Sequence, residues 1–373
     1  MDSSRGHAIP AAALSGHLVI DLKALVRNYQ TLAAQVSPAE AAAVVKADAY
    51  GLGASEVAPA LRAAGCRKFF VAHLQEAASL KAYLQNGASI FILNGLLPGG
   101  EHFAASQGFI PVLNSLEQIA NWQATAQSLG KTLPAILQFD TGMSRLGLAP
   151  QEREQLINSP SLLDGLDIHY VMSHLASADD SASDQNADQQ AVMQAIAEQF
   201  STIPVCFANS GGIFMDKAFH GALARPGIAL YGGVPSDKAG DAIHPVVRLN
   251  VRVVQTRTVP AETRVGYGGT YITRSETRLA TIAAGYADGL PRSLSDRGAA
   301  YYGDVRLPIV GRVSMDSLTI DISALPADSL TLGSMVELIG PHQSLEEIAA
   351  SADTISWEIL TRLGHRYQRE YIQ

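Results

Sequence analysis

The residue with the clearest chemical potential is Lys46, in the segment VVKADAYGLG. It ends a short apolar run at residues 41–45 that is typical of a buried strand, and Tyr50 follows before two glycines. Burial disfavours the charged ammonium. A neutral lysine amine is a nucleophile that can form a Schiff base with a carbonyl cofactor. The alternative interpretation is a lysine whose flexible stem carries its charge from the strand end into solvent.

Four other polar segments follow the ends of apolar runs. They are DTGMSRLG (140–147), MSHLASAD (172–179), ANSGG (208–212) and RPGIALYG (225–232). The planar guanidinium of Arg145 suits a carboxylate, although a polar loop with a structural role fits equally well. A lone histidine such as His174 is more often structural than catalytic. The small residues around Ser210 open a helix, where free N–H groups favour an anion such as phosphate.

These segments need a scaffold of alternating strands and helices. Eight short apolar runs are strand-like: 42–46, 69–72, 89–93, 109–113, 134–139, 166–172, 204–207 and 222–225. Longer stretches between them, such as 75–85, 116–129 and 185–200, have helical spacing. The alternation predicts an α/β fold, a (β/α)8 TIM barrel whose active site lies at the carboxyl ends of the strands. An open doubly wound sheet remains an alternative.

The pattern changes near residue 245. Residues 247–253 alternate apolar and polar side chains with a period of two. Further strand-like runs follow at 278–283, 305–310, 318–322 and 335–339 without long helices between them. We therefore expect an N-terminal tail or strand at 1–17 associated with the β domain, a barrel at 18–240, and a mostly β C-terminal domain at 241–373.

Composition excludes several classes of function. At 373 residues, with 47% apolar and 17% charged residues, the chain predicts a globular protein of two domains. Its net charge is -8 and it has no basic stripe, so nucleic acid is not an expected partner. No apolar run approaches membrane-spanning length. Two cysteines without a CxxC motif predict neither a disulfide framework nor a metal site, and suit the cytoplasm.

VVKADAYGLG closely resembles the cofactor-lysine motif of the alanine racemases, fold-type III enzymes that use pyridoxal 5'-phosphate (PLP), and the other segments extend the match along nearly the whole chain. The resemblance implies that Lys46 carries PLP and that Tyr50 contacts its phosphate. It implies that Arg145 contacts the cofactor's phenolic oxygen and the substrate carboxylate. His174 would link the catalytic tyrosine to an arginine under the cofactor ring.

The same resemblance assigns the rest of the cofactor site. Ser210, in the segment that also contains Asn209, would bind the phosphate together with the backbone of Gly227 and Ile228. Arg225 would face the pyridine nitrogen. Because arginine only donates hydrogen bonds, it leaves that nitrogen unprotonated and limits side reactions of a carbanion. A PLP decarboxylase normally has an acid there, so Arg225 counts against that alternative.

Three segments of the β domain resemble the family's substrate side. VGYGGTY (265–271) would supply Tyr267 as the second catalytic base. GYADG (285–289) and GRVSMD (311–316) would place Tyr286, Met315 and Asp316 at the substrate. In this family the β domain completes the active site of the other subunit, which implies a homodimer with shared sites.

Two positions depart from the family pattern. Gln138 stands where a carbamylated lysine is usual, and we expect it to accept a hydrogen bond from Arg145 with a chloride in the space of the carbamate. His365 aligns with a tyrosine that reaches the phosphate in some members. We predict a PLP-dependent enzyme that interconverts L- and D-alanine with two bases and supplies D-alanine for peptidoglycan. The alternatives are a racemase of broader or serine specificity and a PLP-binding protein without turnover.

Overall fold

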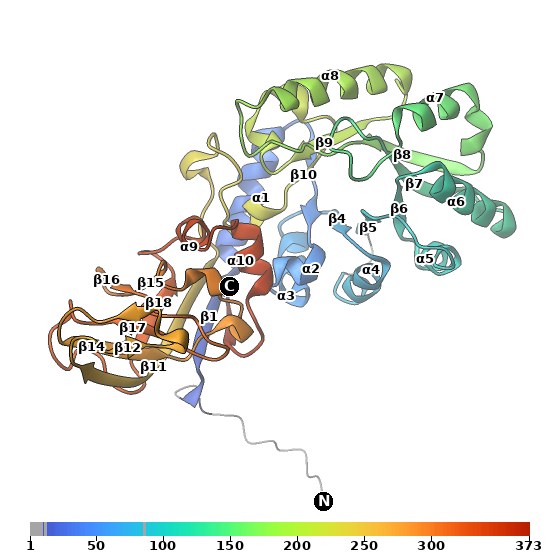
Figure 1. Cartoon of the computed structure of the whole chain (residues 1–373). Helices are drawn as coiled ribbons and strands as arrows, with labels where there is room; N and C mark the ends of the chain where they lie inside the picture. Colours follow the sequence, from blue (N-terminus) through green and yellow to red (C-terminus); the bar gives the residue numbers. More distant parts are fainter. Residues whose placement is uncertain (1–9, 11–12, 85–86) are drawn as a thin grey trace, which may run out of the picture. The chain divides into compact units, whose positions relative to one another are not determined.

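The computed structural model describes residues 10, 13–84 and 87–373, which form two compact units (Figure 1). The barrel unit is Ala24–His244, and the β unit combines Met1–Lys23 with Pro245–Gln373. Residue 18, the expected start of the barrel, lies inside strand β1 (Gly16–Asp21), which pairs with two strands of the β unit. Residues 1–9 and 11–12 of the expected tail lie outside the described residues.

The barrel unit is built on a sheet of parallel strands in the order β2-β10-β9-β8-β7-β6-β5-β4-β3. The strands are β2 (Glu40–Ala41), β3 (Ala43–Val44), β4 (Lys68–Val71), β5 (Ser89–Ile92), β6 (Ile110–Leu113), β7 (Leu133–Gln138), β8 (Leu166–Met172), β9 (Val205–Asn209) and β10 (Leu223–Arg225). Because β2 and β3 are two pieces of one run, separated by Ala42, the ends of the sheet meet and the sheet closes. The TIM-like barrel is therefore confirmed, and all eight predicted runs form its strands.

Helices alternate with these strands. They are α1 (Leu22–Val36), α2 (Lys46–Tyr50), α3 (Ala54–Ala63), α4 (Leu74–Lys81), α5 (Glu101–Gln107), α6 (Leu116–Leu129), α7 (Pro150–Asn158) and α8 (Asp184–Gln199). Of these, α2 is a single turn in which residues 47–50 have positive φ. Helix α6 shows the local logic. Its N-cap Ser115 accepts a hydrogen bond from the Gln118 amide, and Gly130 ends the helix in the left-handed conformation. Trp122 is fully buried and donates to the Pro134 carbonyl of β7.

The β unit is a sheet with the path β16-β15-β18-β11-β1-β19, and off this path β14 pairs with β11 and β17 pairs with β14. Its strands are β11 (Val247–Val259), β14 (Thr277–Ile282), β15 (Ala299–Tyr302), β16 (Val305–Pro308), β17 (Leu318–Asp321), β18 (Met335–Ile339) and β19 (Gln368–Ile372), with the small pair β12 (Arg264–Val265) and β13 (Tyr271–Ile272). Two helices, α9 (Leu345–Ser351) and α10 (Ser356–Arg362), complete it. The predicted mostly β domain is confirmed.

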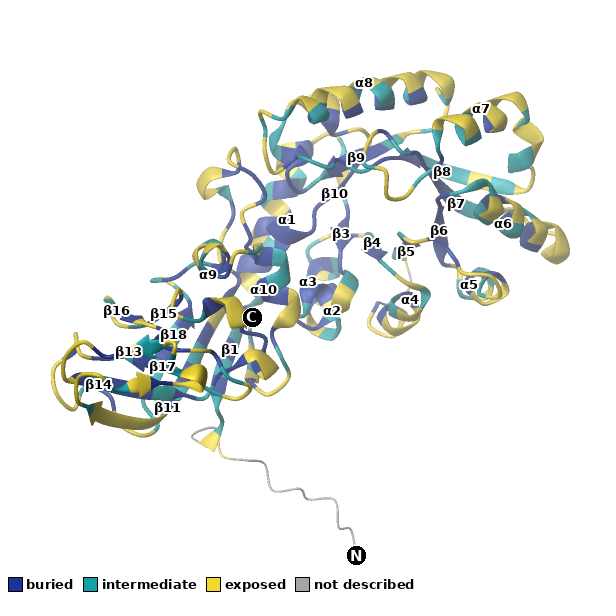
Figure 2. Cartoon of the chain, viewed as in Figure 1, coloured by how far each residue is buried: buried dark blue, intermediate teal, exposed yellow. Residues whose placement is uncertain are grey.

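The pattern of buried residues fits the barrel and the β sheet. The barrel strands are largely buried, whereas α6, α7 and α8 each expose one face (Figure 2). In β11 the alternation predicted from the sequence is observed, since Val247, Leu249, Val251 and Val253 are buried.

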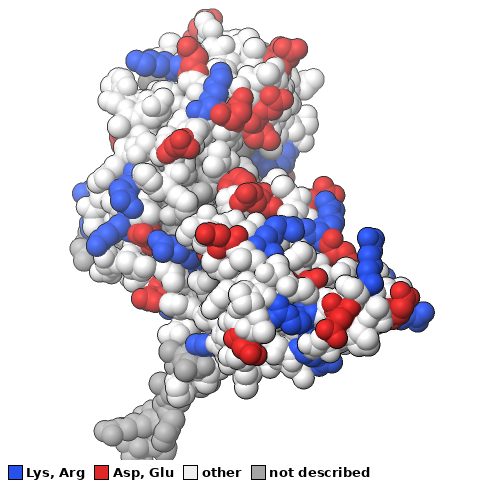
Figure 3. All heavy atoms as spheres, turned by 90° about the vertical axis from the view of Figure 1, so that its left-hand side faces the viewer, with Lys and Arg blue, Asp and Glu red and all other residues white. Residues whose placement is uncertain are grey.

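Surface charge is mixed in sign. On the face drawn in Figure 3, the described lysine and arginine side chains lie among aspartates and glutamates and form no continuous basic stripe. None of the helices that the structure describes is both long enough and apolar enough to cross a bilayer.

Candidate active site

Lys46 lies at the carboxyl end of β3 and begins an unusual turn. Residues 47–50 all have positive φ, between 53° and 56°. The left-handed conformation costs non-glycine residues roughly 1–2 kcal/mol each, so surrounding contacts must hold the turn. The Asp48 carboxylate accepts from the Ala54 amide at 2.7 Å, which joins the turn to the start of α3. The strained segment thus fixes the positions of Lys46 and Tyr50 relative to each other.

Glu76 braces the same turn from α4. Its Oε1 accepts from the Ala47 amide at 2.7 Å, and its Oε2 accepts from the Ala72 amide at 2.6 Å. One carboxylate therefore ties the residue after Lys46 to the end of β4. The sequence analysis did not identify Glu76, although a glutamate in the first turn of a predicted helix is a known signal for backbone capping.

The side chain of Lys46 is partly buried, and its pKa is lowered from the usual value near 10.5. Burial is the largest cause, and the positive charges of Arg145 and Arg225 act in the same direction. The negative charge of Glu76 opposes them. The balance favours the neutral, nucleophilic amine.

Arg225 occupies β10 and is buried, with only neutral acceptors around it. Its Nη1 donates to the Cys206 carbonyl at 2.8 Å, and its Nη2 donates to the Ser173 carbonyl at 2.7 Å. Nη2 also lies 3.3 Å from Nδ1 of His174. Among the contacts of the described residues, none uses the Nε–H of Arg225. One donor therefore remains for an acceptor such as a pyridine nitrogen, and no nearby carboxylate forms a hydrogen bond with the guanidinium.

His174 is neutral in this environment. Its pKa is lowered to about 3, chiefly by burial and then by the charges of Arg225, Arg145 and Lys46. Because arginine can only donate, Nδ1 must accept from Arg225, which places the proton on Nε2. The structure thereby brings Lys46, His174 and Arg225 into one electrostatically coupled group.

A second group forms a cradle for an anion. Ser210 Oγ accepts from the Gly227 amide at 2.8 Å, while the buried Ile228 amide has no partner among the hydrogen bonds of the described chain. A Cβ at Gly227 would lie 2.3 Å from the Tyr50 hydroxyl, so this hydroxyl lies against the same backbone. Burial raises the pKa of Tyr50 and keeps it a neutral donor. Converging hydroxyls and a free amide fit a phosphate, so these residues fit the phosphate of PLP.

Tyr231 supports this cradle and was not identified from the sequence. Its ring stacks on Tyr50 with centroids 4.6 Å apart, and its hydroxyl donates to the Val44 carbonyl at 2.8 Å. The contact fixes the Tyr50 ring against β3. Only the position of Tyr231 in RPGIALYG, close to Gly227 and Ile228, could have suggested this role.

Three other predicted residues of the barrel have side chains that form no hydrogen bond with Lys46, His174 or Arg225 in the described chain. The Asn209 side chain binds the Gly212 amide and the Leu175 carbonyl, so it braces the loop that carries Ser210. Arg145 is exposed, on a loop in which Asp140 Oδ1 accepts from three successive amides of residues 142–144. Gln138 is buried at the end of β7, and the predicted hydrogen bond between it and Arg145 is absent from this structure.

The candidates of the β unit are on its surface. The exposed fractions of Tyr267, Tyr286 and Met315 are 71%, 45% and 52%. Tyr267 begins a short turn between β12 and β13, whereas Tyr286 and Met315 lie on two loops joined by backbone hydrogen bonds. His365 is exposed. Within the described residues, no group of three or more His, Cys, Asp or Glu side chains is arranged to hold a metal ion.

Comparisons with known proteins agree along the chain. Residues 20–235 match the N-terminal domain of alanine racemase, and residues 246–371 match its C-terminal domain. A protein of Agrobacterium fabrum named "Alanine racemase, catabolic" is 60% identical over 373 residues, which cover 100% of this chain and 96% of that protein. A protein of the same name from Rhizobium johnstonii is 59% identical over 363 residues, covering 97% and 96%.

A solved structure is also similar over nearly the full length. The crystal structure of alanine racemase from Bartonella henselae with covalently bound pyridoxal phosphate has a TM-score of 0.93 to this chain. Its sequence is 47% identical, and the alignment covers 96% of this chain and 99% of that one.

Proposed function

We infer that this chain, which belongs to the alanine racemase family and uses PLP, interconverts L- and D-alanine with two bases on opposite faces of the substrate. The observation that carries the inference is the group in the barrel in which a partly buried lysine amine lies near a histidine that is held by a buried arginine. When bound, PLP withdraws electrons from the substrate's α-carbon and so acidifies its proton. The protein's own residues must then hold the substrate and move that proton.

Lys46 and Tyr267 are the proposed bases. Lys46 removes or returns the α-proton on one face, and Tyr267 does so on the other, which inverts the configuration. Each must lie within hydrogen-bond reach of the α-carbon's proton. A free phenol has a pKa of ~10, so Tyr267 needs help to act as a base. A neutral His174 supports this role, because its Nε2–H is free to donate to a phenolate while Arg225 supplies positive charge behind it.

The remaining site residues bind rather than react. Tyr50, Ser210 and the backbone of Gly227 and Ile228 would hold the cofactor's phosphate. The Nε–H of Arg225 would donate to the pyridine nitrogen and keep it unprotonated, which weakens electron withdrawal and favours simple proton return over side reactions.

Substrate contacts come from both units in this proposal. Arg145 would orient the substrate carboxylate from the barrel, and Met315 would meet the same carboxylate through its backbone N–H. Tyr286 and Asp316 would line the entrance. Because the candidates of the β unit are exposed, we propose a homodimer in which the β unit of one subunit completes the barrel site of its partner.

The test is a racemisation assay with the purified protein, PLP and single enantiomers of the protein amino acids. We expect conversion of L-alanine and D-alanine to the racemate and slower conversion of serine. Serine turnover equal to that of alanine would favour the broader racemase, and cofactor binding without turnover of any amino acid would favour the non-catalytic protein.

The metabolic role has two candidates. Supply of D-alanine for peptidoglycan is the first. The second is catabolism of alanine, which is favoured because the relatives from Agrobacterium fabrum and Rhizobium johnstonii are named catabolic. Deletion of the gene separates them, since a D-alanine requirement supports the first and loss of growth on alanine as carbon source supports the second. A cytoplasmic location is proposed because both cysteines are free and buried.

We also propose that a chloride lies near Gln138. This side chain cannot be carbamylated, and Arg145 has no carboxylate partner in the described chain, so a small anion would neutralise the positive charge. Activity is therefore expected to respond to chloride and not to dissolved carbon dioxide. The assay uses carbon-dioxide-free buffer with chloride replaced by a bulky anion at constant ionic strength. A rate that ignores the halide contradicts the proposal.

A further inference from the structure

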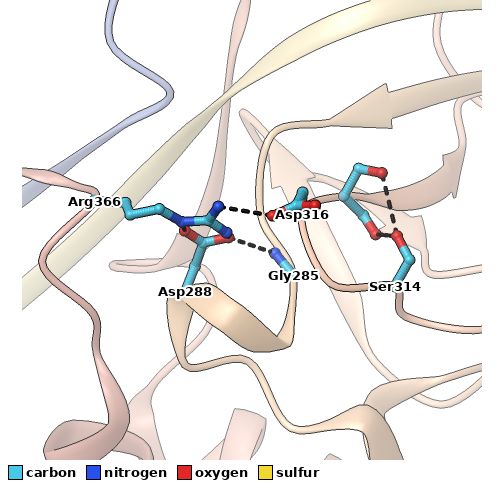
Figure 4. Close-up of polar contacts among 6 residues, drawn as sticks. Gly285, Asp288, Ser314, Asp316 and Arg366 are labelled. Atoms are coloured by element: carbon cyan, nitrogen blue, oxygen red, sulfur yellow. Dashed lines mark hydrogen bonds and ion pairs between the residues drawn. The ribbon is translucent and has the colours of Figure 1, made fainter.

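A polar network in the β unit joins two loops to the C-terminal segment (Figure 4). The carboxylate of Asp288 is buried and accepts two hydrogen bonds from Arg366, from Nε at 2.6 Å and from Nη2 at 2.7 Å. The Gly285 amide donates to the same carboxylate at 2.9 Å. The third nitrogen of Arg366, Nη1, binds Asp316 at 2.7 Å. One guanidinium therefore bridges two carboxylates on different loops.

The two loops lie backbone against backbone. The Tyr286 amide donates to the Ser314 carbonyl, and the Ala287 amide donates to the Met315 carbonyl, both at 3.0 Å. A Cβ at Gly285 would lie 2.3 Å from the carbonyl oxygens of Ser314 and Met315. The loops are thus too close for any side chain at this position, and a small shift of one loop must move the other.

The C-terminal segment packs on the same loops. The Gly364 amide donates to the Asp288 carbonyl at 3.1 Å. A Cβ at Gly289 would lie 2.1 Å from the Arg362 carbonyl oxygen. These backbone contacts fix the segment in which Arg366 lies, so the guanidinium is presented to both carboxylates from a held position.

The two arms of the network differ in kind. Asp288 is buried with a side-chain exposure of 3%, so its charge needs the bidentate fork that only arginine provides. Asp316 has a side-chain exposure of 65%, where solvent screens the ion pair and its contribution to folding is small. The Asp316 arm is therefore better explained by the position it imposes than by the stability it adds.

We propose that Arg366 is a positioning residue for substrate binding. It binds both Asp288 and Asp316 and so fixes the loops that carry Tyr286 and Met315 relative to each other. The inference rests on the proposed function, in which Tyr286 lines the substrate entrance and the backbone N–H of Met315 meets the substrate carboxylate. The bases are not part of the clamp, so its loss weakens binding of alanine more than it slows proton transfer.

The test is a pair of matched variants of the full-length PLP enzyme. Arg366→Lys keeps the charge, but one ammonium cannot replace a fork that contacts two carboxylates. We expect the KM for L-alanine to rise about 10-fold and kcat to change less than about twofold, the pattern of lost binding that is common to ground and transition states. Arg362→Lys is the control, because among the described residues Arg362 forms an ion pair only with Glu358, on its own helix at 3.2 Å. Its KM should equal that of the wild type.

A double-mutant cycle shows whether Arg366 acts through Asp316. Asp316→Ala removes the exposed arm alone, because an asparagine would keep an acceptor oxygen for Arg366. Combining Asp316→Ala with Arg366→Lys should add little to the larger single effect. The proposal is overturned if the KM of the double variant rises by the product of the two single increases. It is also overturned if the KM of Arg366→Lys equals that of Arg362→Lys. If Arg366→Lys does not fold, Asp316→Ala decides, and an unchanged KM in that variant overturns the proposal.

Amide hydrogen exchange separates the clamp from the proposed activity. Arg366→Lys should exchange faster than Arg362→Lys at residues 285–289 and 313–316, with no change in the barrel. Equal exchange in the two variants contradicts the clamp whether or not the protein racemises alanine. A wild-type protein that racemises no amino acid contradicts the proposed function alone.

Discussion

The two units hold their candidate residues in opposite ways. In the barrel, Arg225 and Ser210 are buried. The pKa values of His174 and Lys46 are lowered by burial and by the positive charges of neighbouring side chains. In the β unit, Tyr267 and Tyr286 are exposed, and the network around Asp288 holds the loop of Tyr286 from behind. The barrel groups are therefore held by contacts within their own unit, whereas the candidates of the β unit are exposed, as the proposed homodimer requires.

The difference suggests that buried and exposed candidate residues have different roles. A buried, closely bonded group can fix protonation states before the substrate arrives, which is how preorganised electrostatics favours a reaction. An exposed residue can be supplied and withdrawn by the movement or association of a whole domain. Each of the following substitutions affects one side of this comparison.

The largest effect is expected in the barrel, from Lys46→Ala. Loss of the amine removes both the covalent attachment of PLP and one base, so racemisation should fall about 10⁴-fold, the upper range for an acid–base group. The visible absorbance of lysine-bound cofactor should also disappear. Lys131→Ala, at an exposed position, is the control. A borohydride-stable adduct mapped to another lysine would show that the assignment of Lys46 is wrong.

On the β side, Tyr267→Phe should abolish one direction of proton abstraction and spare the cofactor. We expect abstraction from L-alanine to slow about 10²–10⁴-fold, while the α-proton of D-alanine still exchanges with solvent deuterium through Lys46. Tyr271→Phe is the control, because Tyr271 lies four residues on and packs against the local core. Equal loss of exchange from both enantiomers contradicts the two-face mechanism.

Arg225→Lys probes the preorganisation of the barrel. A lysine cannot reproduce the bonds to Cys206, Ser173 and His174 while also facing the pyridine nitrogen. Loss of one such oriented donor typically lowers turnover about 10²-fold. With the donor removed, the ratio of pyruvate formed by transamination to alanine racemised should rise. An unchanged ratio would leave no support for the role of Arg225 at the ring nitrogen.

The smallest effect is expected from Glu76→Gln, which tests the pKa of Lys46. The negative charge of Glu76 raises this pKa, so removing it lowers the pKa further. Only the neutral amine captures PLP, and capture therefore fails as pH falls below the pKa of Lys46. In Glu76→Gln apoprotein, the acid limb of PLP uptake against pH should move to lower pH. Movement to higher pH contradicts the electrostatic account.

Sequence and structure agree best where the signal is local. All the barrel strands except β2 contain a short apolar run, and α6 has its own cap and terminating glycine, so these elements were predictable. The pairing of β1 with β19 joins opposite ends of the chain, and no local pattern specifies it. That is why the expected barrel start at residue 18 lay inside a strand of the β unit.

Only part of the candidate site could be predicted from the sequence. Motifs placed Lys46 and its partners on the strand ends, but alanine, aspartate and tyrosine have no intrinsic preference for the left-handed turn at 47–50. That turn depends on Glu76, which is distant in sequence. The neutral state of His174 follows first from its burial and then from the charge of Arg225 beside it, and it could not be inferred from either motif alone.

The most direct test of the account mixes two inactive proteins. In a homodimer with shared sites, a subunit with Lys46→Ala and a subunit with Tyr267→Phe form one doubly damaged site and one intact site. We expect each variant alone to be inactive and the equilibrated mixture to recover about a quarter of the wild-type rate, since half the dimers are mixed and each has one intact site of two. Mass spectrometry verifies that mixed dimers have formed. If they recover no activity, the claim that the barrel of one subunit and the β unit of the other form one active site is contradicted.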